Sequence, residues 1–211
     1  GDKYSVRHIG YCPEWADGIT DFITLGNLGI IDLSGLFYCC ENFNGRLSEN
    51  FNTSRVKDMR GMFYNANNFN QPFNANWDTG NVTDMSHMFN SAESFNQPFP
   101  ANWNTVNVRD MSCMFYNAES FNQPLSGGKS GGKWDTSNVR DMGLMFSYAK
   151  SFNQPLNFNT VNVTNMYGMF YCATSFNQPL NFDMSNVEDR GDMFYNVKRF
   201  NQPFPLRNIR N

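Results

Sequence analysis

Apolar residues return along this chain at intervals much longer than the period of a helix or a strand. One aromatic residue, preceded each time by Leu or Met, recurs seven times, with spacings of 26, 26, 26, 31, 24 and 24 residues. It stands at Phe37, Phe63, Phe89, Phe115, Phe146, Phe170 and Phe194. Self-similarity at such a period is the signature of a repeat architecture. The pattern therefore predicts seven similar coils stacked on one another.

Within one coil the pattern predicts a strand, a helical turn, a second strand and a corner. In the third coil residues 81–83 read as a strand, and the apolar positions in residues 85–92 have the three- and four-residue spacing of helical turns. Asp84 stands where it can accept the first free N–H groups. Residues 95–97 read as a second strand, which Pro98 ends because proline has no N–H to donate.

A unit of 24 to 26 residues is too short for a pair of packed helices but suits a leucine-rich-repeat-like coil. We therefore expect a repeat solenoid of that type, with short parallel strands and one helical turn in each of seven coils. The expected domains are an N-terminal cap at 1–24, the coils at 25–207 with an insertion at 126–133, and a tail at 208–211.

Three phrases of the repeat carry a resemblance to a known family. Residues 134–142 (WDTSNVRDM), 81–89 (NVTDMSHMF) and 151–156 (SFNQPL) resemble the BspA-like repeat of bacterial surface proteins, and the likeness covers about 180 residues. The resemblance implies a leucine-rich-repeat-type solenoid, common in surface lipoproteins and adhesins, with relatives in protists and large DNA viruses. It implies no catalytic residues and no shared ligand.

Charge and hydropathy exclude several classes of partner. The 211 residues carry 16 Lys and Arg against 19 Asp and Glu, a net charge of -3, so we expect no nucleic acid partner. No stretch approaches the roughly 20 apolar residues of a membrane span. The chain begins at Gly1 rather than Met, which fits a processed or trimmed product.

The sequence shows no catalytic constellation. There is no Gly-x-Ser-x-Gly elbow, and the chain has only two histidines, His8 and His87. The aspartate that precedes each helical turn is expected to accept backbone N–H groups, with a calcium site as the weaker alternative. We therefore expect no enzyme, no cofactor and no metal.

Candidate interaction residues lie in three places. The insertion offers Lys129, Ser130 and Lys133, and its Gly-Lys-Ser is not a phosphate loop because Gln123 stands where the first glycine is required. Arg109 and Arg140 belong to a basic stripe that Thr83, Thr164 and Glu188 interrupt. The C-terminal end offers Phe204, Leu206 and Ile209; there, either the natural protein continues or a partner covers the last coil.

Five cysteines leave two alternatives. Cys12 of the cap could form a disulfide with Cys39 or Cys40, or the cysteines could be small buried thiols.

Two functions remain open on the sequence alone. The first is a surface-exposed module, extracellular or on the cell surface, that binds a protein or glycan in adhesion. The alternative is a structural subunit, scaffold or cement, that docks on a neighbouring subunit of a cellular assembly or virion through its weakly capped C-terminal end.

Overall fold

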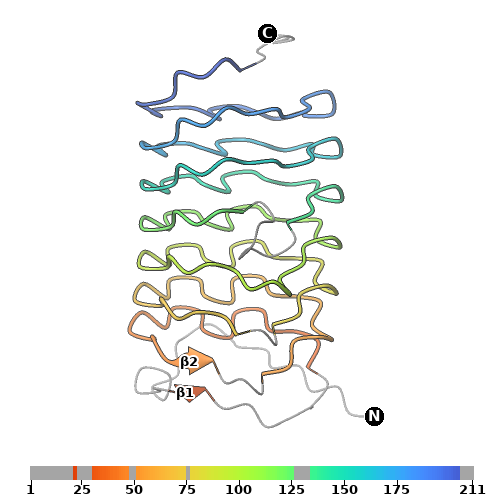
Figure 1. The fold of residues 1–211 in the computed structure, drawn as a ribbon, viewed down its shortest axis with the longest axis vertical. Helices are drawn as coiled ribbons and strands as arrows, with labels where there is room; N and C mark the ends of the chain where they lie inside the picture. Colours follow the sequence, from red (N-terminus) through yellow and green to blue (C-terminus); the bar gives the residue numbers. More distant parts are fainter. Residues whose placement is uncertain (1–20, 23–29, 48–50, 75–76, 126–133, 205–211) are drawn as a thin grey trace.

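The computed structural model describes residues 21–22, 30–47, 51–74, 77–125 and 134–204. The chain forms coils that lie one on the next from the N-terminal end to the C-terminal end (Figure 1). Residues one repeat apart in the sequence are therefore neighbours in space.

Regular strands are short. The strands β1 (Asp21–Phe22) and β2 (Arg46–Leu47) pair in parallel, with Asp21 opposite Arg46 and Phe22 opposite Leu47. The other described coils meet through single parallel bridges at one column, formed by Asp32, Asp58, Asp84, Asp110, Asp141, Asn165 and Asp189. The three-residue strands expected at 81–83 and 95–97 are thus not formed. Pairing in the register of the coils already includes β1, inside the segment expected to be a cap.

The main contact between coils is an eight-residue segment that we call the turn strip, residues 85–92 in the third coil. In that coil alternate N–H groups, from Met85 to Ser91, donate to carbonyls of the next coil over 2.7–3.0 Å. The N–H groups of Met88, Asn90 and Ala92 donate to the carbonyl three residues earlier over 3.1–3.2 Å. Every backbone donor of the strip is satisfied, since the N–H of Ser86 donates to the Asp84 carboxylate.

The turn strip is not helical, so the expected helical turn is wrong. The described residues contain no helix, and the strip consists of two successive four-residue turns. The third residue of each turn has a positive φ, between 53° and 62°, which is the geometry of type II turns and interrupts a helix. In the third coil these residues are His87 and Ser91. Two such turns place apolar residues three and four apart, as a helix does.

Side-chain ladders bind the coils at other positions. At the Asn-Gln-Pro corner, the Asn96 carboxamide oxygen accepts the N–H of Asn122 and the amide of Gln123 in the next coil, at 3.0 Å each. On another side, buried Thr79 donates its hydroxyl to the carbonyl of Asn104 at 2.9 Å. Equivalent bonds link most of the described coils, so identical residues in successive coils hold the register.

Two columns of phenylalanine fill the core. One contains the seven aromatic residues that reveal the repeat, and their ring centroids lie 5.3–5.7 Å apart. The other runs from Phe43 to Phe200 with centroids 5.7–6.0 Å apart. Trp103 and Trp134 are stacked at 6.4 Å, so the insertion between them leaves the stacking intact.

The aspartate column makes the local contact expected from the sequence. Each of its seven residues accepts, through Oδ1, the N–H of the residue two positions on, at 2.8–2.9 Å. Asn165 does the same without a charge, and its amide donates to both oxygens of Asp141 at 3.1 Å. The expectation that these side chains accept backbone N–H groups is confirmed.

The tryptophan column carries a testable energetic consequence. The indole N–H groups of Trp77, Trp103 and Trp134 are buried without a hydrogen-bond partner, and other coils place phenylalanine at this position. Because an unpaired buried donor costs about 1–3 kcal/mol, Trp103→Phe should change the free energy of unfolding by less than about 1 kcal/mol. Trp103→Ala, which opens a cavity, should cost about 3–5 kcal/mol. Urea unfolding measures both, and a Trp103→Phe loss as large as that of Trp103→Ala would contradict the unpaired indole.

A second prediction concerns Asp58. Burial raises the pKa of its carboxyl, the charges of Asp84 and Asp32 add to this, and Arg60 opposes it. Asp58→Asn keeps the Oδ1 acceptor, as Asn165 does, and should stabilise the fold at pH 7 by up to about 1 kcal/mol.

The pH dependence has a definite sign. Because the folded carboxyl binds its proton more tightly than the unfolded one, its ionisation costs stability as pH rises above about 3.9. The advantage of Asp58→Asn over the wild type should therefore disappear at about pH 3, which urea unfolding at the two pH values measures. An equal advantage at both pH values would show that charge is not its cause.

Candidate binding face

The outward side of the turn strip carries a row of tyrosines, which we call the tyrosine face. Most follow directly after the buried phenylalanine of the strip, and all are half-buried or exposed. The residues are Tyr38, Tyr64, Tyr116, Tyr148, Tyr171 and Tyr195. Ring centroids of neighbours lie 4.7 Å apart for the first pair and 4.8–5.7 Å apart along the last four. In the third coil Asn90 takes the tyrosine position, and His87 lies 6.1 Å from Tyr64.

The phenols of this face are neutral donors at physiological pH. Burial raises the pKa of Tyr38 and Tyr116, and neighbouring tyrosines and cysteines add to it. Tyr167, one row aside and 41% exposed, donates to the Asp192 carboxylate at 3.3 Å, whose charge raises the pKa of this tyrosine. The face thus offers rings and hydroxyl groups rather than charge.

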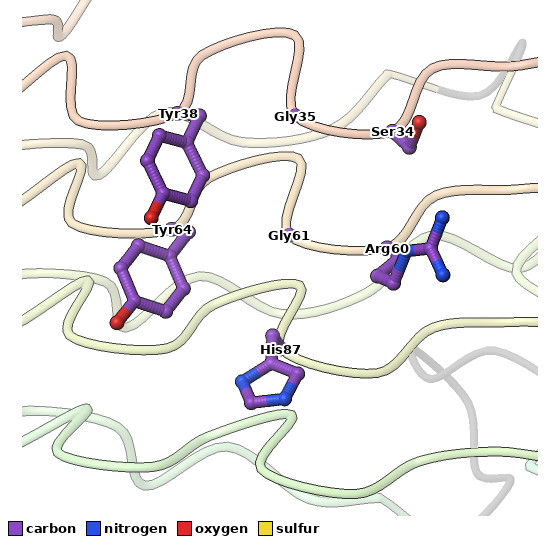
Figure 2. Close-up of a pocket in the computed structure, with 7 residues that line it drawn as sticks. All are labelled: Ser34, Gly35, Tyr38, Arg60, Gly61, Tyr64 and His87. Carbon is purple, nitrogen blue, oxygen red and sulfur yellow. The ribbon is translucent and has the colours of Figure 1, made fainter. Parts of the chain in front are cut away.

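A hollow of about 360 Å³ opens at the N-terminal part of this face (Figure 2). Its lining comes from three successive coils: Ser34, Gly35, Tyr38, Arg60, Gly61, Tyr64 and His87. The rings of Tyr38 and Tyr64 stand on one side of the two glycines, and Arg60 stands on the other.

The hollow exists because two coils place glycine at the first positive-φ position of the strip. A Cβ added to Gly61 would meet no atom closer than 3.7 Å. Other coils hold side chains there, His87 in the third and Leu144 in the fifth, at the same φ of 56–57°. Backbone geometry alone therefore does not demand glycine, and its effect is to leave space open.

The hollow is rich in hydrogen-bond donors. The Arg60 guanidinium makes one contact with a described residue, 3.5 Å from the Asp58 carboxylate, and its side chain is 57% exposed. The amide of Asn90 lies 3.0 Å from Nδ1 of His87, and Ser91 donates to the oxygen of that amide. Nδ1 is therefore the acceptor, and Nε2 of His87 carries the proton.

The basic stripe expected from sequence lies on adjacent coils. The N–H of Arg140 donates to the carbonyl of Arg109 at 2.9 Å, and both side chains are exposed. Thr83 and Thr164 continue the column on either side and confine the two cations to its middle.

Several predicted site residues lie outside the described residues. These are Lys129, Ser130 and Lys133 of the insertion, Leu206 and Ile209 near the C-terminus, and Cys12. The proposed Cys12 disulfide stays a prediction; Cys39 carries a free thiol, and the buried Cys40 thiol donates to the carbonyl of Tyr38 at 3.9 Å.

The end of the last described coil is less covered than the interior coils. Phe204 is half-buried and packs against Phe194, with ring centroids 5.1 Å apart. A hollow of about 280 Å³ lies there, between Arg190, Asp192, Met193, Phe194, Tyr195 and Phe204. Tyr195 is 56% exposed, the most open of the large apolar side chains described.

Metal and membrane features were searched over the part of the chain that the structure describes. In it no three His, Cys, Asp or Glu side chains converge as a metal ion would require. None of its segments forms a helix long and apolar enough to cross a membrane.

Sequence reasoning missed the tyrosine face and the hollow. A signal was available, since Phe-Tyr recurs in five of the seven coils, at residues 37–38, 63–64, 115–116, 170–171 and 194–195. A helical reading of the strip gives no reason to place the residue after each buried phenylalanine on one outward row.

A family model described as a Mycoplasma protein of unknown function, DUF285, matches the chain twice, over residues 31–131 and over residues 128–211. No curated protein and no solved structure matches it. The two matches together span most of the 211 residues. The chain therefore belongs to the DUF285 family, whose function is unknown.

Proposed function

We propose that this chain is a non-enzymatic binding module, a leucine-rich-repeat-like solenoid of the BspA-like type, that acts in adhesion at the cell surface or outside the cell. Its partner is a protein or a glycan. The observation that carries the proposal is the tyrosine face, a row of outward aromatic rings on a stack of coils. Tyrosine supplies a large, stiff contact area together with a hydroxyl group, which is why it is enriched in binding interfaces.

The described chemistry gives little support to an enzyme. Burial raises the pKa of the Cys113 thiol to about 11, and the charges of Asp141 and Asp110 add to this, so the thiol is protonated at neutral pH. A cysteine nucleophile requires the opposite shift. The aspartate column is committed to backbone N–H groups of its own turns.

A second candidate is a structural subunit that docks through its C-terminal end. It is favoured by the N–H groups of Asp192, Phe194 and Asn196, which correspond to groups that donate to the next coil elsewhere and have no described coil beyond them. Half-buried Phe194 and Phe200 lie at the same end.

The tyrosine face can be removed without changing the core. Tyr116→Ser combined with Tyr171→Ser should keep the melting temperature within a few degrees, because Ser147 occupies the same position in the fifth coil. Binding to an array of immobilised glycans and matrix proteins should fall at least tenfold. The matched control is Arg109→Thr combined with Arg140→Thr, whose threonines copy Thr83 and Thr164. Loss of binding in the control alone would move the site to the basic stripe and overturn the proposal.

The two candidate functions predict different masses in solution. A binding module should elute from size exclusion with light scattering near 24.3 kDa, the mass of this chain. A larger particle of fixed stoichiometry, dissociated by Phe194→Asp at the C-terminal end, would favour the structural subunit.

A further inference from the structure

We propose that the hollow between Tyr38, Tyr64 and Arg60 binds one carboxylated sugar unit of a glycan, a uronate or a sialate. This inference rests on the proposed binding function and names the ligand class of one site on the tyrosine face.

The dimensions fit a single small ligand. A volume of about 360 Å³ lies near the lower end of the range for ligand sites. The two rings on one side provide an apolar wall against which the C–H groups of a sugar can pack (Figure 2). The glycines between that wall and Arg60 let the ligand approach the backbone.

The charge of the lining selects an anion. Among the lining residues Arg60 has the only full charge at neutral pH, and no carboxylate belongs to the lining. The Ser34 and tyrosine hydroxyls and Nε2 of His87 are further donors. A ligand with many oxygen acceptors and one carboxylate satisfies this set, whereas a cationic ligand would face Arg60.

Arg60 is available for a ligand carboxylate. Its contact with Asp58 is a single one at 3.5 Å on an exposed side chain, which is a weak ion pair. The Oδ1 atom of Asp58 is already held by the N–H of Arg60 at 2.9 Å. Most of the five guanidinium N–H donors therefore remain for a carboxylate, which they can bind in bidentate geometry.

The fifth coil supplies a variant that fills the hollow. Leu144 occupies the position equivalent to Gly61 at a φ of 56°, against 58° for Gly61. A Cβ at Gly61 meets only Tyr64 and Tyr38, at 3.7 and 4.0 Å. Gly61→Leu should thus fold as the wild type does while its side chain occupies the site.

The test measures binding of trigalacturonate and of 3'-sialyllactose by NMR titration of the labelled protein. The neutral controls are the methyl ester of trigalacturonate and lactose. Wild-type protein should bind at least one acid at least tenfold more tightly than its neutral control, and the acid that binds identifies the source of the carboxylate. Arg60→Gln should remove that preference, and Gly61→Leu should abolish binding with a melting temperature within a few degrees of the wild type.

The outcomes separate this inference from the proposed function. Equal binding of acid and neutral control, binding unaffected by Gly61→Leu, or no binding of any of the four sugars overturns the carboxylated-sugar site. In each of these cases the proposed function still stands if the Tyr116→Ser and Tyr171→Ser variant loses binding on the array. If that variant binds normally while the hollow variants fail, the hollow stands and the extended tyrosine face is wrong.

Discussion

The hydrogen bonding of the turn strip is the constraint on which the rest of this structure depends. Alternate N–H groups leave the coil for the carbonyls of the next one, four at every junction and all in the same direction, while the groups between them close turns within the coil. A helix would spend all its donors internally, and a strand would share them with both neighbours. This division of donors requires a positive φ twice in each coil.

Fixed register follows from that division, and the ladders follow from fixed register. Because each residue lies against its own counterpart in the next coil, one favourable contact is repeated at every junction. Phenylalanine rings stack on phenylalanine, and asparagine amides bond to asparagine. The same geometry penalises charge, since aspartates also meet aspartates, and burial with neighbouring charges raises the pKa of Asp58. Residue choice at one column is therefore a property of the whole stack rather than of one position.

Periodicity in the sequence is sufficient to locate the coils, the core columns and the role of Asp84, since each depends only on which residues recur. It is insufficient to distinguish a helical turn from two type II turns, because both place Met85, Met88, Phe89 and Ala92 on one buried side. The difference lies in φ at His87 and Ser91, neither of which is a residue that announces a left-handed conformation. The candidate site was missed for the same reason, since its hollow depends on which coils have glycine at that position.

Function in such a stack has to come from the positions that the stack does not fix. Core and ladder columns are held by their own copies, so variation there costs stability in two junctions at once. The first positive-φ position is different: it projects outward, already tolerates a strained backbone, and holds glycine, histidine, cysteine, leucine or aspartate in successive coils. Where it is glycine in two successive coils, Gly35 and Gly61, the surface opens between Arg60 and the tyrosines. Where Leu144 fills its own position, its side chain also reaches 2.6 Å from where a Cβ of Gly168 would stand, so this next glycine is occupied by its neighbour. The same backbone thus carries an open site at one end and a closed one further along, and a change of single residues at this column is enough to move, add or remove a site without disturbing the coils.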